Sequence, residues 1–192
     1  MKRIVLVLCM IMCQSISYAQ TELVKDIDGD NMQDTVYVDT KESTLVCKLS
    51  SHDYNSIKSY YIDIRDVECS VSSARNGFYF SKDWMRSGYK CQFRYDNRLR
   101  KIQLIGMSRY EFGGATNDGS GKSSVNLLNN RYVGEWKCFD ELSLVLLKIP
   151  TIKQKMELPV TYLSSFDDEI SNLYLSKCSE LYSMNRELIL RK

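Results

Sequence analysis

The sequence is poor in the residues on which most catalytic motifs depend: it contains one histidine, two prolines and, beyond residue 19, no two cysteines at the close spacing of a zinc or redox site. Because His52 is the only histidine, every histidine-based triad and every histidine-containing zinc site would have to use it. It lies in a polar stretch, residues 50–54, with no nucleophile motif nearby, which is typical of a histidine in a surface turn. These shortages argue against the common hydrolase and zinc-enzyme classes.

The sequence also lacks a stretch of about 20 apolar residues, the length that a transmembrane helix requires. Its longest apolar run, residues 4–12, follows the basic Lys2 and Arg3 and leads to small residues at Ser17 and Ala19. A basic start, a short apolar segment and small residues before the cleavage point predict a secretory signal peptide over residues 1–19. We therefore expect an exported protein without a membrane span.

Neither leader cysteine follows the small residue that a bacterial lipid anchor requires, since Leu8 precedes Cys9 and Met12 precedes Cys13. The predicted mature chain begins at Gln20. The leader holds two basic residues and no acidic one, so the mature chain carries 24 basic and 24 acidic side chains. This neutral balance, without a long cluster of lysines and arginines, argues against a nucleic-acid binder.

Five cysteines remain in the predicted mature chain, and an odd number cannot all pair within one molecule. In an oxidising compartment at least one thiol would stay free or pair between chains, and the pairing of the others is not defined by the sequence. The favoured interpretation is that they are small buried hydrophobic residues on strands. They are Cys47, Cys69, Cys91, Cys138 and Cys178.

The most specific pattern is the acidic run from residue 26 to residue 34, Asp-Ile-Asp-Gly-Asp-Asn-Met-Gln-Asp. Carboxylates at its first, third, fifth and ninth positions can converge on one hard cation. The sequence therefore predicts a calcium loop, and the alternative is an acidic, solvated turn. The expected ligands are Asp26, Asp28, Asp30, Asp34 and the main-chain carbonyl of Met32.

This loop departs from an EF-hand, because Tyr37 occupies the twelfth position, where the bidentate glutamate would be, and Asn31 replaces the glycine of the sharp turn. Val36 and Val38 alternate with other residues, so strands rather than helices flank the loop. The pattern resembles the calcium loops of FG-GAP and VCBS-type extracellular β repeats. The resemblance covers residues 25–39 and implies calcium and a β context, without an activity.

Short runs with strand periodicity continue beyond the loop, separated by turn residues. The Asn76-Gly77 pair predicts a tight hairpin with a type I′ turn. The expected fold is mainly β, an antiparallel sheet array of propeller-like, sandwich or barrel type. We expect strands at 21–25, 34–39, 44–49, 57–64, 67–72, 78–80, 89–95, 101–107, 125–128, 132–139 and 143–149, with one further extended piece between Pro150 and Pro159.

The C-terminal segment changes to helical periodicity. Apolar residues at a spacing of three to four predict an α-helix over about residues 165–190, with Ser165 as its cap and acidic residues 167–169 at its positive end. The length of the chain fits a single β-rich domain over residues 20–192 that ends in this helix.

The stretch from Gly113 to Lys122 is the longest one rich in glycine and small polar residues, and it predicts a long exposed loop. Long loops frequently carry function, and aromatic side chains dominate many interfaces, so we expect a partner to bind here. The predicted partner-binding residues are Trp84, Tyr110, Glu111, Asn117, Asp118 and Ser120.

Residues 89–136 resemble uncharacterised exported bacterial proteins through a Leu-Ile-Gly run at 104–106 and a Ser-Val-Asn-Leu-Leu run at 124–128. Single-domain β proteins of this type with a similar acidic loop are similar to periplasmic inhibitors or immunity proteins against wall-degrading enzymes. The single histidine, the lack of a nucleophile motif, the neutral charge and the exposed loop favour an exported, non-enzymatic binding module with a calcium-binding loop. The resemblance implies an inhibitor or immunity protein that acts on another periplasmic or extracellular protein.

Two alternatives stay open. A structural surface protein would self-assemble. A carboxylate-based hydrolase of cell-wall or glycan substrates needs two carboxylates at a defined separation, which the sequence does not set. Residues 121–123 match the end of a phosphate-binding loop, but Thr116 replaces its first glycine and a strand follows, which argues against such a site. The carboxylates available to the hydrolase are Asp83, Glu111, Asp118, Glu135 and Asp140.

Overall fold

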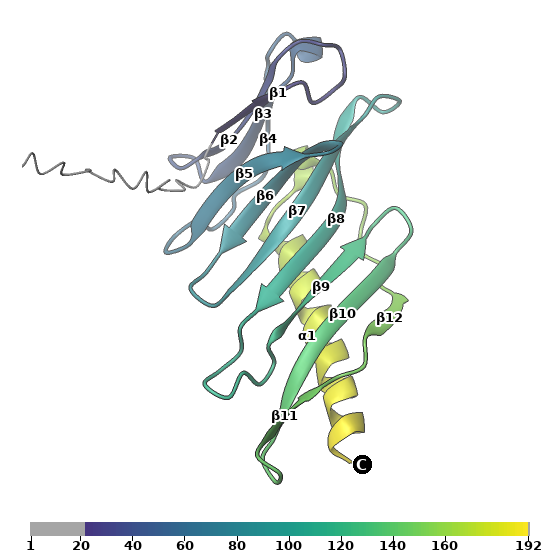
Figure 1. Cartoon of the computed structure of the whole chain (residues 1–192). Coiled ribbons are helices and arrows are strands. Elements are labelled where there is room, and N and C mark those ends of the chain that lie inside the picture. The colour runs from purple at the N-terminus through teal and green to yellow at the C-terminus, as the bar shows by residue number, and fades with distance from the viewer. Residues whose placement is uncertain (1–21, 192) are drawn as a thin grey trace, which may run out of the picture.

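The computed structural model describes residues 22–191, which form two antiparallel sheets and one long C-terminal helix (Figure 1). The predicted signal peptide lies outside the described residues. The mainly β fold with a C-terminal helix is confirmed. Within residues 22–191 neither sheet closes on itself, so the arrangement is sandwich-like rather than a barrel. No helix in this range combines the length and the apolar character needed to cross a membrane.

The small sheet has the order β1-β2-β3-β4 and carries the acidic loop between its first two strands. In β2 every second residue is buried, as expected for a strand with one face on a core. A short 3-10 helix, η1 (Ser50–His52), follows β3. The strands are β1 (Glu22–Lys25), β2 (Asp34–Asp39), β3 (Thr44–Lys48) and β4 (Ser56–Lys58).

The strand predicted over residues 57–64 is wrong beyond Lys58. Residues 59–67 form an irregular link whose backbone bonds to other parts of the molecule. The Tyr60 amide donates to the Phe166 carbonyl at 2.9 Å, and the Ile62 amide donates to the Ser43 carbonyl at 2.8 Å. These bonds satisfy the backbone of a segment that connects the two sheets and the start of the helix.

The large sheet has the order β11-β10-β9-β8-β7-β6-β5, and β12 also pairs with β10. Because β11 and β12 are both antiparallel to β10, they form one edge, which is interrupted near Pro150. The strands are β5 (Glu68–Ala74), β6 (Gly77–Asp83), β7 (Ser87–Asp96), β8 (Lys101–Glu111), β9 (Gly121–Asn126), β10 (Arg131–Asp140), β11 (Val145–Lys148) and β12 (Ile152–Lys155).

The hairpin between β5 and β6 forms where it was predicted, but its turn is not type I′. Ala74 pairs with Gly77, so Arg75 and Asn76 are the residues of the turn, and of these three only Gly77 has a positive φ, +106°. A Cβ on Gly77 would lie 2.0 Å from the Phe93 carbonyl oxygen, so the close approach of β7 also requires glycine here.

The helix α1 (Asp168–Leu190) begins later than predicted, and its N-cap is Asp167, not Ser165. The Asp167 side chain accepts a hydrogen bond from the Glu169 amide at 2.9 Å. Ser165 belongs instead to a preceding 3-10 turn, η2 (Leu163–Ser165). Phe166 separates the two turns and inserts into the core, where its ring meets those of Phe80 and Phe93 edge-on. Phe166 and Asp167 are therefore extended, and the helix begins only after them.

The helix packs across one face of the large sheet and leaves the opposite face uncovered (Figure 1). Its buried stripe contains Ile170, Tyr174 and Cys178, at the four-residue spacing of one helix face, and Ser171 beside them. Tyr174 also bonds to the β9 side chain of Ser123, with 3.0 Å between the two hydroxyl oxygens. Full burial of a large apolar side chain contributes about 1.5–3 kcal/mol, so this stripe holds the helix on the sheet.

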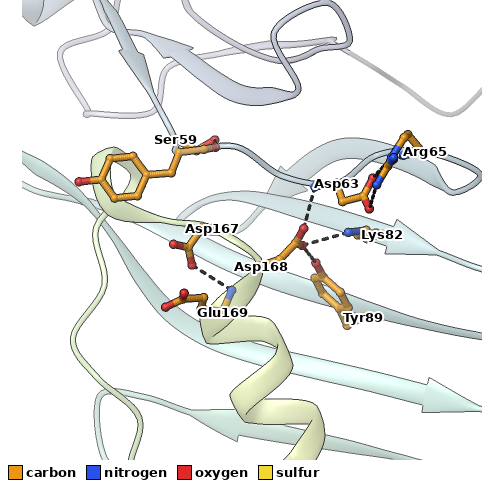
Figure 2. Close-up of polar contacts among 9 residues, drawn as sticks. Ser59, Asp63, Arg65, Lys82, Tyr89, Asp167, Asp168 and Glu169 are labelled. Carbon is orange, nitrogen blue, oxygen red and sulfur yellow. Dashed lines mark hydrogen bonds and ion pairs between the residues drawn. The ribbon is translucent and has the colours of Figure 1, made fainter.

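A polar network fixes the first turn of α1 (Figure 2). Asp168 Oδ1 accepts from Lys82 Nζ at 2.9 Å and from the Tyr89 hydroxyl at 3.3 Å. Its Oδ2 accepts from the Asp63 amide at 2.7 Å. One carboxylate thus connects β6, β7 and the link between the sheets to the helix start.

All five cysteines in the described range are free thiols, and only Cys69 is not fully buried. Their burial raises the pKa of each thiol, that of Cys69 to about 11. The interpretation as small buried side chains holds, although Cys178 lies on α1 and not on a strand.

Candidate metal centre and open sheet face

The acidic loop is a tight connection between β1 and β2, whose pairing ends at Lys25 and Asp34. Two positions take the left-handed conformation that the turn requires, Gly29 with φ +85° and Asn31 with φ +67°. Asparagine adopts this conformation at less cost than most residues. Asn31 therefore performs the conformational role of the glycine that the EF-hand loop has at this position.

Three of the predicted ligands converge. Asp26, Asp28 and Asp34 each offer one carboxylate oxygen, and these oxygens lie within 4.8 Å of one another. Asp34 is completely buried and Asp28 is 8% exposed. The loop holds the carboxylates by donating its own amides: Gly29 and Asn31 to Asp26 at 2.7 and 3.0 Å. The Ile27 amide likewise donates to Asp34 Oδ2 at 2.7 Å.

Asp30 is not part of the converging group. Its Oδ1 accepts from the Met32 amide at 2.7 Å and its Oδ2 from the Ser50 hydroxyl at 2.7 Å. These bonds, that of Ser50 first, lower the pKa of the Asp30 carboxyl. The Met32 side chain is exposed, and its carbonyl stays a predicted ligand. The structure therefore brings together three of the four predicted carboxylates.

Two residues of the site were missed in the sequence, Ser50 and Ser51 of η1. The Ser50 amide donates to Asp34 Oδ1 at 2.8 Å, and the Ser51 hydroxyl donates to Asp28. The Ser50 hydroxyl lies between two carboxylates, 2.7 Å from Asp30 Oδ2 and 3.0 Å from Asp34 Oδ1, and shares its single proton between them. The signal for them is the pairing of β2 with β3, because Lys48 lies opposite Thr35 and the chain after Lys48 must then pass Asp34.

The site is negatively charged without a compensating side chain. None of the salt bridges among residues 22–191 involves Asp26, Asp28 or Asp34. Cys47 lies beneath the loop, and its burial, together with the charges of Asp34 and Asp28, raises the pKa of its thiol. Buried carboxylates normally require a cationic partner or a metal ion. Oxygen donors held close together in a turn fit a hard divalent cation such as calcium.

The predicted long loop spans residues 112–120, because Gly121 and Lys122 belong to β9. It is anchored at both ends. Arg86 Nε donates to the Gly113 carbonyl at 2.9 Å. Asp118 Oδ1 accepts from the Phe139 amide at 2.6 Å and from the Tyr182 hydroxyl at 3.1 Å, so this carboxylate bonds within the protein.

The other predicted contact residues surround two hollows at this end of the large sheet. Tyr110, Glu111 and Ser120 line a mainly apolar hollow of about 490 Å³. Trp84, 39% exposed, lines another of about 740 Å³ that Tyr110 also borders. Asn117 is exposed in the turn and lines neither hollow. The structure thus brings four of the six predicted residues to this end of the sheet.

The uncovered face of the large sheet carries a further hollow that the sequence did not indicate. It has a volume of about 540 Å³ and merges with one of about 500 Å³, since Lys90, Ser108, Ser124 and Val133 line both. Residues opposite one another in an antiparallel ladder point to the same face, and these four form one row across β7 to β10. A second row beside it contains Gln92, Gly106, Asn126 and Arg131.

The carboxylates considered for a hydrolase all have partners within the protein. On the open face Asp83 accepts from the Tyr110 hydroxyl at 3.0 Å, and Glu135 lies 3.5 Å from Lys122 Nζ. Asp83 and Glu135 belong to one row, four strands apart, which is about 19 Å at the backbone. Glycosidases place their two carboxyl groups within about 10 Å of each other. Glu111 pairs with Arg109, and Asp140 accepts from Ser143.

Comparisons with protein-family models, with curated proteins and with solved structures find no match.

Proposed function

We propose that this protein is an exported binding protein whose large sheet docks another periplasmic or extracellular protein, in the manner of an inhibitor or immunity protein. The observation that carries the proposal is the uncovered, hollowed face opposite α1. A sheet of this size normally covers both faces or leaves one face simply polar and solvated. Here small residues line the centre of the face and larger ones surround them, so the face is concave. Concave surfaces are typical of binding sites.

Calcium has a structural role in this proposal. The ion neutralises the converging carboxylates of Asp26, Asp28 and Asp34 and stabilises the loop that begins the small sheet. Support comes from the buried state of two of these carboxylates and from the lack of a cationic partner for them among residues 22–191. Calorimetric titration with calcium should give binding at one site. Absence of heat, or equal binding by an Asp34→Asn variant, would contradict this role.

The test of partner binding uses the tagged full chain and two tryptophan variants. Ser124→Trp fills the open face, whereas Ser176→Trp places the same side chain on the exposed side of α1. We expect wild type and Ser176→Trp to retain one protein from the exported fraction of the native host, and Ser124→Trp to lose it. The purified partner should then bind in a 1:1 ratio, and its own activity should fall.

Equal retention by Ser124→Trp would refute the open face as the docking surface. Cleavage of a purified wall or glycan substrate, without any partner, would favour the hydrolase. Sequencing of the mature N-terminus tests export, and a start at Gln20 is expected.

A further inference from the structure

We propose that the open face recognises an extended acidic segment of its partner through Lys90, Arg94 and Arg131. This inference rests on the proposed function and specifies the chemistry of the partner. The three cationic side chains all line the hollow of about 540 Å³, and no aspartate or glutamate lines it. Within residues 22–191 none of the three takes part in a salt bridge. Their charges are therefore available to a ligand.

The spacing of the three cations defines the ligand. Lys90 and Arg94 are four residues apart on β7, about 13 Å along the strand. Lys90 and Arg131 are three strands apart, about 14 Å across the sheet. A compact anion would be bound only if these long side chains bent towards one point, whereas an extended ligand meets each of them above its own position on the sheet. An extended peptide with acidic residues about four positions apart matches this separation.

The surface between the three cationic side chains carries only small residues. Gly106, Ser108 and Ser124 occupy its centre, and a Cβ on Gly106 would already approach the Val125 carbonyl oxygen to 3.2 Å. Gln92 and Asn126 flank this surface and offer both donors and acceptors to a peptide backbone. A main chain can therefore lie across the face while its acidic side chains reach the cations.

Two features favour a peptide over other polyanions. The hollow includes the apolar side chains of Val133 and Leu128, the latter 51% exposed, which would contact the apolar residues of a peptide. The next row along the sheet contains two carboxylates, Asp83 and Glu135, and one cation, Lys122, which pairs with Glu135. A continuous phosphate backbone that ran beyond the three cations in this direction would meet Asp83, which has no cationic partner among residues 22–191, and be repelled there.

The probe is a synthetic peptide with glutamates four residues apart, compared with its glutamine counterpart, with oligogalacturonate and with inorganic polyphosphate. Binding is measured by fluorescence anisotropy or calorimetry. The variant Arg94→Ala/Arg131→Ala removes two of the cations. Lys41→Ala/Lys177→Ala removes the same charge from the turn between β2 and β3 and from α1, as a matched control. Unchanged melting temperatures establish that both variants are folded.

We expect the glutamate peptide to bind, to weaken at least tenfold in Arg94→Ala/Arg131→Ala, to stay unchanged in the control and to weaken with added salt. The glutamine peptide should not bind. Equal or tighter binding of oligogalacturonate or polyphosphate would refute the choice of a peptide. If the glutamate peptide fails to bind while Ser124→Trp still abolishes partner capture, the acidic-segment inference is wrong and the docking face stands. If Ser124→Trp leaves capture intact, the proposed function itself fails.

Discussion

Lys82 on β6 and Asp168 in the first turn of α1 form an ion pair of 2.9 Å that is largely removed from solvent, with side-chain exposures of 7% and 25%. Tyr89 and the Asp63 amide complete the hydrogen bonding of the same carboxylate (Figure 2). An ammonium group that is this well buried costs free energy unless it is paired. The pair therefore determines where the helix starts on the sheet as well as how firmly it is held.

Replacement of Asp168 by asparagine keeps an acceptor for the Asp63 amide but leaves the Lys82 charge unpaired. We expect the free energy of unfolding to fall by about 3 kcal/mol, measured by urea denaturation. The double variant Lys82→Met/Asp168→Asn should recover more than half of this loss, because the buried charge is gone. Arg191→Ala breaks the exposed pair with Glu187 and should cost less than about 0.5 kcal/mol. Similar losses in all three variants would contradict the role of burial.

The two aspartates Asp34 and Asp30 should differ in their effect on calcium. Asp34 lies in the converging group and Asp30 does not, so Asp34→Asn should abolish the rise in melting temperature that calcium causes, and Asp30→Asn should retain most of it. For wild type, calcium at 100 times its dissociation constant should add about 2.7 kcal/mol. The quantity measured is the melting temperature in calcium minus the melting temperature in chelator, for each variant. Because each variant is compared with itself, any effect of the substitution on the fold alone cancels. Equal behaviour of the two variants would contradict the three-carboxylate site.

Alkaline pH should destabilise the protein through its thiols. Burial raises the pKa of the Cys69 thiol from 9.0 to about 11. A raised folded-state pKa gives stability that is complete below pH 9 and is lost as the pH rises towards 11, since the unfolded chain releases its proton first. Urea denaturation between pH 8 and pH 11 should show this decline, and Cys69→Ser should make it shallower. A flat profile in wild type would contradict the burial of the thiols.

The loop between β1 and β2 and its cluster of carboxylates could be predicted because their signal is local. The spacing of four aspartates within nine residues and the strand alternation after Asp34 do not depend on the rest of the chain. The start of the helix could not be predicted in this way. Ser165 and Asp167 are both good caps, and the choice between them depends on Phe166, which must reach the core before the helix begins.

The composition of the open face and the position of the η1 serines beside the acidic loop could not be predicted. Both depend on how the strands are aligned, and no single segment of the sequence determines that alignment. Lys90, Arg94 and Arg131 share a hollow only because four strands pair in a particular alignment. A shift of one residue in any strand would turn its side chains to the other face. The cationic hollow is therefore a property of the assembled sheet.

Alanine substitutions at Gly29 and Gly77, which both have a positive φ, distinguish the cost of backbone strain from the cost of a steric collision. Gly29 has φ +85° and open space where a Cβ would lie, whereas a Cβ on Gly77, at φ +106°, would lie 2.0 Å from the Phe93 carbonyl oxygen. Gly29→Ala, measured in chelator, should cost only the conformational strain of about 1 kcal/mol. Gly77→Ala adds a collision with the backbone of a central strand and should cost about 3 kcal/mol or more. Urea denaturation measures both, and equal losses would mean that the β5–β6 hairpin can move away from β7, contrary to the tight approach that requires glycine there.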